Sequence, residues 1–224
     1  MAGSNLRDRI LPTIIAGTRN PEKMEALMAV LEGMARLAPL PLDISHEIEE
    51  DGDEAGETAE EIAAGKASAW SRRLGAAGRE NLVVGSDGGL LLPALGNDWN
   101  PVRTRRFAGV GKDARARADA LIALTDHLEG NQRRIGWREA VAFARHGKVV
   151  ATFVAESVPG LLARDYDPTL VVANGFWVPA LWICPEFGGR RLAELMPEER
   201  AKRDDHWSRL RRQVRQAFSD LPQA

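Results

Sequence analysis

The sequence predicts a mixed α/β protein. In the first half of the chain, short β-branched runs alternate with segments of helical periodicity, and candidate strands dominate the middle. This order is typical of layered α/β proteins rather than of helix bundles or β-sandwiches. The 224 residues contain no internal repeat, low-complexity linker or convincing domain break. We therefore expect one domain over residues 1–224, with flexible ends at about 1–10 and 219–224.

The N-terminal part of the chain predicts a strand followed by a helix. Residues 13–17 form a β-branched run that ends in glycine, which is typical of a buried strand. Asn20 is a favourable N-cap and Pro21 a favourable first helical residue, so a helix is expected to begin here and to stop before Pro39. A methionine-rich stripe is expected to fill the core: Met24, Leu27, Met28, Leu31 and Met34.

The other elements follow from hydrophobic periodicity and turn residues. The expected strands span residues 40–48, 82–85, 89–95, 137–144, 148–154 and 175–183. The expected helices span residues 58–74, 112–128 and 197–218. His146-Gly147 should join two antiparallel strands, and the strand at 82–85 should run into a turn.

Composition excludes several classes of protein. The 30 Lys and Arg and 32 Asp and Glu side chains give a formal charge of −2, so the chain as a whole is not attracted to nucleic acid or an anionic membrane. The single cysteine, Cys184, excludes a disulfide framework, and its apolar surroundings favour a small buried side chain over a nucleophile. Without a signal peptide or a stretch of roughly 18 apolar residues, a cytoplasmic location is expected.

Polar side chains gather where the first strand meets its helix. Thr18, Asn20 and Lys23 lie at a helix N-terminus, where backbone N–H groups and the helix dipole favour anions. Lys23 could reach a phosphate as a point charge. The alternative is a capped helix with a solvated lysine.

Two acidic positions are further candidates. Glu61 ends a tract of nine carboxylates that begins at Glu47. It either completes a capping box with Thr58 or binds a hard cation such as Mg²⁺. Asp87 stands where an apolar strand gives way to glycines, which is typical of a site at a strand's carboxyl end, although it could be an ordinary turn residue.

The final helix is basic and amphipathic. Its apolar stripe, from Trp207 to Phe218, indicates that it packs on the body of the protein, so nucleic-acid binding ranks low. Either its cations are solvated and complement the helix dipole, or an edge that includes His206 and Arg209 faces phosphate.

Six partial motifs occur in one order along the chain. They are Thr18-x-Asn20-x-x-Lys23, Thr58-x-x-Glu61 with Lys66-Ala67, Ser86-Asp87-Gly88-Gly89-Leu90, Thr104-Arg105-Arg106-Phe107-Ala108-Gly109, Gly175-Phe176, and Glu194-Leu195-x-Pro197-Glu198-Glu199-Arg200. Through them the chain resembles the Ham1-like family of inosine triphosphatases, from about residue 12 to 212. The family's counterparts are T/S-x-N-x-x-K, an acidic metal-holding helix, D-D-S-G-L, S-A-R-Y-A-G, G-F-G-Y-D-P and E-L-S-P-E-E-K.

The chain departs from the family pattern at four places. Ser86 replaces the first Asp of D-D-S-G-L, and Gly88 stands where the family has Ser. Pro179 occupies the place of an Asp that helps to recognise the purine edge. The family's S-H-R-G-R is altered so that Asp205 takes the place of its His unless one residue is inserted to align His206. These changes bear on base selectivity more than on phosphate handling.

The resemblance implies a twisted mixed sheet flanked by helices, an elongated shape and a central nucleotide-binding cleft. It implies hydrolysis of a nucleoside triphosphate, of the ITP, dITP or XTP type or with an altered base preference, to the monophosphate and pyrophosphate. Mg²⁺ would be the cofactor, with Mn²⁺ as a substitute, and the protein would be a homodimer with no nucleic-acid or membrane partner. The alternative is a catalytically impaired nucleotide-binding sensor or partner protein of the same fold.

The resemblance also implies roles for individual residues. Asp87, Glu61 and Lys23 would be catalytic, and Glu61 and Asp87 would hold the metal. Phe176 would stack on the base, with Trp177 beside it. The full set of expected substrate contacts is Thr18, Asn20, Lys23, Lys66, Ser86, Gly88, Arg106, Phe176, Arg200, His206 and Arg209.

Overall fold

The chain is divided into two compact units. The computed structural model describes residues 11–45, 56–109, 113–171 and 175–221. Unit 1 comprises residues 1–87, 140–154 and 207–224, and unit 2 comprises residues 88–139 and 155–206. The chain passes between the units four times, inside β3 (Leu82–Leu91), β4 (Arg134–Arg145) and β5 (Lys148–Glu156) and at the first residue of α7 (His206–Ala217). The two compact units favour two domains, whereas the strands that both units share favour one. The single domain therefore stays a prediction.

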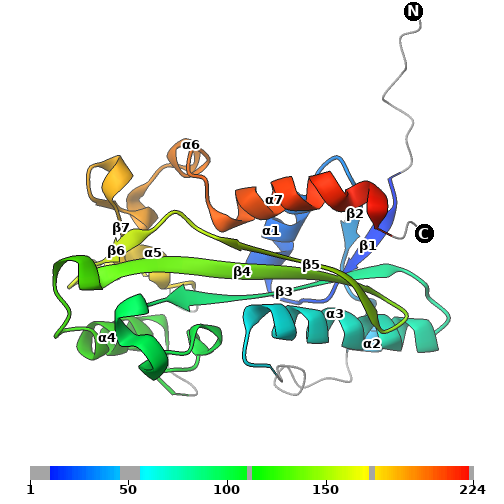
Figure 1. Ribbon diagram of the computed structural model, residues 1–224, viewed down its shortest axis with the longest axis horizontal. Helices are drawn as coiled ribbons and strands as arrows, with labels where there is room; N and C mark the ends of the chain where they lie inside the picture. Colours follow the sequence, from blue (N-terminus) through cyan, green and yellow to red (C-terminus); the bar gives the residue numbers. More distant parts are fainter. Residues whose placement is uncertain (1–10, 46–55, 110–112, 172–174, 222–224) are drawn as a thin grey trace, which may run out of the picture. The chain divides into compact units, whose positions relative to one another are not determined.

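The described strands form one mixed sheet, which confirms the predicted fold class (Figure 1). The order is β2-β1-β3-β4-β6-β7-β8, with β5 paired to β4. In unit 1, β1 (Thr13–Ala16) pairs in parallel with β2 (Arg36–Ala38) and with β3. In unit 2, β6 (Gly160–Leu162) pairs antiparallel with β4 and with β7 (Trp182–Cys184), which pairs antiparallel with β8 (Arg190–Arg191).

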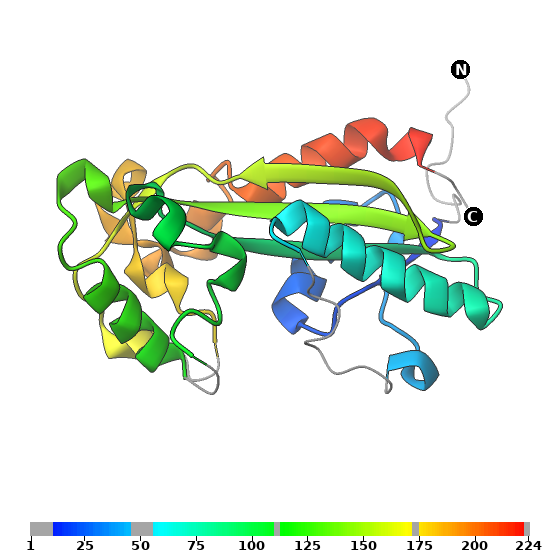
Figure 2. The same cartoon turned by 60° about the horizontal axis from the view of Figure 1, so that its bottom comes forward.

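Helices cover the strands of unit 1. They are α1 (Pro21–Leu31), α2 (Leu42–Ser45), α3 (Ala59–Ala76) and α7 (His206–Ala217), followed by the 3-10 helix η7 (Phe218–Asp220). In Figures 1 and 2, α3 and α7 lie on opposite sides of the strands of this unit. A buried cluster that includes Trp70, Leu74 and Val83 joins α3 to the sheet. Residues 219–221, expected to be flexible, include the end of η7 and the buried Leu221.

Unit 2 joins short helices to the other part of the sheet. Its α-helices are α4 (Ala114–Leu124), α5 (Val178–Leu181) and α6 (Pro197–Arg200). Its 3-10 helices are η1 (Pro93–Asp98), η2 (Pro101–Arg103), η3 (Gly130–Arg133), η4 (Pro168–Leu170), η5 (Pro185–Phe187) and η6 (Leu192–Glu194). One apolar cluster, rich in tryptophan, forms its core. No helix in the described part of the chain is long and apolar enough to cross a membrane.

Several predicted elements are confirmed. Asn20 caps α1 and Thr58 caps α3, each through its side-chain oxygen. β4 and β5 pair as predicted, and the two turn residues, His146 and Gly147, have φ values of 52° and 74°. Positive φ at both positions gives the turn the twist that a two-residue hairpin needs. Leu210 and Val214 of α7 are buried, so the final helix uses its apolar stripe for packing.

Other predictions near the N-terminus are confirmed only in part. α1 ends at Leu31, and its buried face is Leu27, Val30 and Leu31, while Met28 is 50% exposed. The methionine stripe is therefore only partly core. Residues 40–48 were expected to be extended, but α2 begins just after Pro41, which is compatible with a helix start and cannot donate to a sheet. Residues 46–48 lie outside the described residues.

Predictions for the middle and end of the chain are also corrected. β3 is one strand through Ser86-Asp87-Gly88-Gly89, where a turn was predicted. The expected strand at 175–183 contains the short helix α5, whose first turn includes Pro179, and only its last two residues belong to a strand, β7. The expected helix at 197–218 is two helices, α6 and α7, separated by residues 201–205.

Cys184 is a buried side chain, as predicted, and we expect it to be chemically inert in the folded protein. It is 0% exposed, and burial raises the pKa of its thiol from 9.0 to about 11. At pH 8 the folded protein should then hold about 100-fold less thiolate than the unfolded chain. Iodoacetamide should modify Cys184 only after unfolding in guanidinium chloride, as followed by mass spectrometry. Equal rates of modification with and without denaturant would contradict this burial.

Candidate functional site

The start of α1 uses two of the predicted polar side chains for capping. Oδ1 of Asn20 accepts from the backbone N–H of Glu22 at 2.9 Å and of Lys23 at 3.4 Å. Oγ1 of Thr18 accepts from the backbone N–H of Asn20 at 3.2 Å. These contacts hold the turn before the helix in one conformation. The helix is therefore capped, as in the alternative interpretation. The cap uses only the backbone N–H of Lys23, so its ammonium group can contact other residues.

Two lysines from different helices converge on one dipeptide in β3. Nζ of Lys23 donates to the backbone carbonyl oxygen of Ser86 at 3.3 Å, and Nζ of Lys66 lies 2.8 Å from Oδ1 of Asp87. Asp87 is only 8% exposed, so its carboxylate needs such a partner. The structure thus brings together Lys23, Lys66, Ser86 and Asp87, all within unit 1.

Glu61 lies in the first turn of α3 and helps to cap it. Its backbone N–H donates to Oγ1 of Thr58 at 3.2 Å, as predicted. Its Oε2 accepts from the backbone N–H of Glu57 at 2.8 Å, whereas the capping box was expected to reach the amide of Thr58. Residues 47–55 of the acidic tract lie outside the described residues. Among the residues that the structure describes, no group of three His, Cys, Asp or Glu side chains is arranged to hold a metal.

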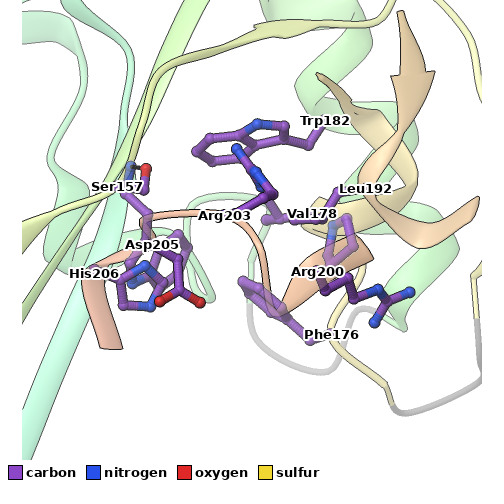
Figure 3. A pocket seen from close by; sticks show the side chains of 11 residues that line it. Ser157, Phe176, Val178, Trp182, Leu192, Arg200, Arg203, Asp205 and His206 are labelled. Atoms are coloured by element: carbon purple, nitrogen blue, oxygen red, sulfur yellow. Dashed lines mark hydrogen bonds between the residues drawn. The ribbon is translucent and has the colours of Figure 1, made fainter. Parts of the chain in front are cut away.

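Unit 2 contains a pocket of about 160 Å³ whose walls are mainly aromatic and apolar (Figure 3). It brings together three residues predicted to bind substrate, namely Phe176, Arg200 and His206. The lining residues are Trp137, Ser157, Phe176, Val178, Pro179, Trp182, Leu192, Arg200, Arg203, Asp205 and His206. An aromatic pocket with a few charged groups is the usual form of a site for a small organic ligand.

The cations of this pocket are held by protein groups. Arg203 is 7% exposed; its Nε donates to Oε1 of Glu186 at 2.8 Å, and its guanidinium lies 5.6 Å from the Trp182 ring centre. Arg200 donates to the backbone carbonyl oxygens of Leu195 and Ala193, each at 3.0 Å. These contacts fix the two guanidinium groups, and Arg203 is ion-paired with Glu186, so charges of both signs lie at this pocket.

Some residues predicted to bind substrate lie neither in the cluster of Lys23, Lys66, Ser86 and Asp87 nor in the aromatic pocket. Arg106 is exposed in the turn after η2, and Gly88 lies beside Glu139, both in unit 2. Arg209 lies on α7 in unit 1. The prediction that Trp177 stands beside Phe176 in the site is wrong, because Trp177 is buried in the core and packs on Phe107 with 6.0 Å between ring centres.

Sequence reasoning missed Trp137. Its ring packs edge-to-face on Phe176, with 5.1 Å between ring centres and 85° between planes, and lies 6.1 Å from the His206 ring. Trp137 and Phe176 are far apart in the sequence, and six tryptophans give no local sign of which one lines a pocket.

The chain is similar to proteins of known family and structure. The sequence model of the Ham1 family matches residues 14–216. A dITP/XTP pyrophosphatase of Bacillus subtilis is 28% identical over 174 residues, which cover 74% of this chain and 83% of that protein.

Solved structures agree with this match. A HAM1 protein of Coxiella burnetii aligns with a TM-score of 0.72 at 21% identity, covering 94% of this chain and 100% of that one. A nucleoside-triphosphatase described as a dITP/XTP pyrophosphatase, from Mycobacterium abscessus, aligns with a TM-score of 0.63 at 27% identity, covering 94% and 99%. The shared fold extends over almost the whole chain.

Proposed function

Because the chain belongs to the Ham1 family, we propose that it hydrolyses a nucleoside triphosphate with a non-standard purine base to the monophosphate and pyrophosphate. The observation that carries the proposal is the convergence of Lys23 and Lys66 on Ser86-Asp87. Two ammonium groups beside a poorly exposed carboxylate can bind a polyanion and place a proton acceptor next to it. An ion pair with a purely structural role would need only Lys66, which already pairs with Asp87, and would not need Lys23 beside it.

Phosphate binding falls to the cations and donors of unit 1. Lys23 and Lys66 would neutralise charge that builds on the leaving pyrophosphate. Thr18 and Asn20 hold the turn before α1, whose N-terminal N–H groups and dipole favour the same negative charge. The capping contacts of Thr18 and Asn20 would then orient these N–H groups toward the phosphate.

Asp87 would act on the attacking water. The water oxygen forms a bond to the α-phosphorus while the bond from that phosphorus to the α–β bridging oxygen breaks. The proton of the water passes to the Asp87 carboxylate, and pyrophosphate leaves with the bonding electron pair. The Lys66 ammonium, 2.8 Å from Oδ1 of Asp87, keeps this carboxylate in one orientation.

The carboxylates of unit 1 are suitable in kind for Mg²⁺, with Mn²⁺ as a substitute. Mg²⁺ usually takes one or two protein carboxylates and completes its shell with waters and substrate phosphates, so a cage of three acidic side chains is not required. Glu61 and Asp87 would hold the ion. A bound divalent cation supplies charge neutralisation on the phosphates. Glu61 would have to exchange its contact with the Glu57 amide for this role.

The aromatic pocket of unit 2 would receive the base. Phe176 and Trp137 offer ring surfaces, and base–aromatic stacking is tolerant of which base is bound. Pro179 contributes no hydrogen-bonding side chain to this pocket, while Asp205 contributes a carboxylate. This donor set supports an altered base preference within the purines.

A triphosphate panel tests the proposal. ITP, dITP, XTP and the four common nucleoside triphosphates are incubated with the protein and Mg²⁺ or Mn²⁺, and pyrophosphate is measured. We expect release from at least one non-standard purine triphosphate, with loss of activity in EDTA. If no triphosphate of the panel is hydrolysed with either metal, the proposal that the protein is an enzyme of this kind would be refuted.

A nucleotide-binding protein without catalysis is the second candidate. The observation that favours it is Ser86, which replaces a family carboxylate; its hydroxyl oxygen is buried and has no hydrogen-bond partner among the described residues. Calorimetry that shows saturable triphosphate binding without any product would favour this candidate. Turnover in the panel would eliminate it.

The homodimer and the cytoplasmic location also stay proposals. Light scattering on the purified protein would measure twice the 24.5 kDa chain mass if the homodimer forms.

A further inference from the structure

Glu139 is a buried carboxylate that the proposed reaction does not use. It lies on β4, is 1% exposed, and its Oε2 accepts from Nε1 of Trp137 at 3.0 Å. Residues 137 and 139 of a strand share one face of the sheet, so both side chains point the same way. A buried carboxylate needs hydrogen-bond donors, and the indole N–H of the half-buried Trp137 supplies one to Oε2 of Glu139.

The Trp137 residue is fixed at its backbone as well as at its ring. Its N–H donates to Oγ of Ser157 at 2.9 Å, and its carbonyl oxygen accepts from the Ser157 N–H at 2.8 Å. With the backbone held by Ser157 and the indole held by Glu139, the ring is restricted to one orientation. That orientation sets the angle of 85° at which it meets Phe176 in the pocket.

Gly88 makes room for the Glu139 carboxylate. A Cβ atom at this position would overlap Oε2 of Glu139 and would lie 2.7 Å from the carbonyl oxygen of Arg138. Any larger residue at 88 would therefore displace the carboxylate or the strand. In this chain the absence of a side chain at residue 88 and the position of the Glu139 carboxylate are therefore sterically coupled.

We propose that Glu139 is a positioning residue for base binding. Its carboxylate, for which Gly88 leaves room, holds the Trp137 indole in the orientation in which that ring and Phe176 stack on the base. This inference rests on the proposed function, since the ligand is the purine base of the triphosphate. It assigns Gly88 a role in accommodating Glu139, where a direct substrate contact was predicted.

Kinetics of variants at residue 139 test this role. E139A should raise KM for the preferred triphosphate about tenfold or more, because an unanchored ring loses stacking, while kcat changes less than about threefold. E139Q keeps a carbonyl oxygen that can accept from the indole, so its KM should stay near that of the wild type. E156A removes an exposed carboxylate paired with Arg138 and is the matched control. If E139A does not fold, W137F, which keeps a ring but lacks the N–H donor, should raise KM in the same way.

A double variant tests the link to Gly88. G88S should displace Glu139 and raise KM as E139A does. In G88S/E139A the overlap with the carboxylate is gone and only the 2.7 Å approach to the Arg138 carbonyl oxygen remains, so the double variant should raise KM by clearly less than the product of the two single effects. Additive effects, or an unchanged KM in E139A and W137F, would overturn the inference while wild-type turnover upholds the proposed function. Wild-type protein that neither binds nor hydrolyses any triphosphate would overturn both.

Discussion

Replacing Asp87 by Asn is expected to lower the kcat of pyrophosphate release by about 10²- to 10⁴-fold, the usual contribution of a positioned proton acceptor. The amide has nearly the same shape as the carboxylate, so packing around this 8% exposed side chain should be conserved. It cannot accept a proton from water, and it is a weaker partner for Lys66, whose Nζ lies 2.8 Å from Oδ1. The measurement is a steady-state pyrophosphate assay on the preferred triphosphate.

The matched control is Asp43→Asn. Asp43 is also a carboxylate paired with a cation, with Oδ2 2.9 Å from Arg79, but its side chain is 61% exposed. This variant should keep wild-type kcat and KM. If D87N lost less than about tenfold in kcat while it remained folded by circular dichroism, Asp87 would not be the proton acceptor.

Replacing Arg133 by Met is expected to lower the free energy of unfolding by about 3–4 kcal/mol, because it removes hydrogen bonds from several buried carbonyl groups. Arg133 is 5% exposed, and burial lowers the pKa of its guanidinium. The group donates to the carbonyl oxygens of Thr125, Leu128, Leu162 and Ala163, at 2.7 to 3.3 Å. Methionine fills much of the volume but removes the guanidinium donors of all four acceptors. The Thr125 oxygen keeps the Leu128 N–H at 3.1 Å and the Leu128 oxygen keeps Arg164 at 3.0 Å, so the cost falls mainly on the carbonyl groups of Leu162 and Ala163.

Urea denaturation followed by circular dichroism measures this effect. The neighbouring Arg134 is exposed, so Arg134→Met should change the free energy of unfolding by no more than about 0.5 kcal/mol. Equal stability of the two variants would mean that water replaces the lost donors and that Arg133 does not anchor these loops.

Elements with a local chemical signal could be predicted from the sequence. Asn20-Pro21 marks the start of α1, and His146-Gly147 marks the hairpin turn, because each signal acts within a few residues. Gly88-Gly89 misled the prediction: glycine permits a turn, but here it permits close approach of Glu139 and Pro101 to a continuous strand. That reason lies in residues distant along the chain.

In the candidate site, too, residues with a local motif could be predicted and residues placed by long-range packing could not. Lys23, Asp87 and Phe176 were named from motifs, and the structure shows contacts of Lys23 with Ser86 and of Lys66 with Asp87, while their roles stay a prediction. Trp137 could not be predicted, because its position in the pocket depends on packing against Phe176 and on a hydrogen bond to Glu139. Long-range packing has no counterpart in a single sequence.

The origin of the oxygen atom in the products tests the proposed reaction most directly. The preferred triphosphate is hydrolysed in ¹⁸O-labelled water, and the products are analysed by mass spectrometry. Attack on the α-phosphorus predicts one labelled oxygen in the nucleoside monophosphate and none in pyrophosphate. Label in pyrophosphate, or release of orthophosphate with a nucleoside diphosphate, would contradict the account.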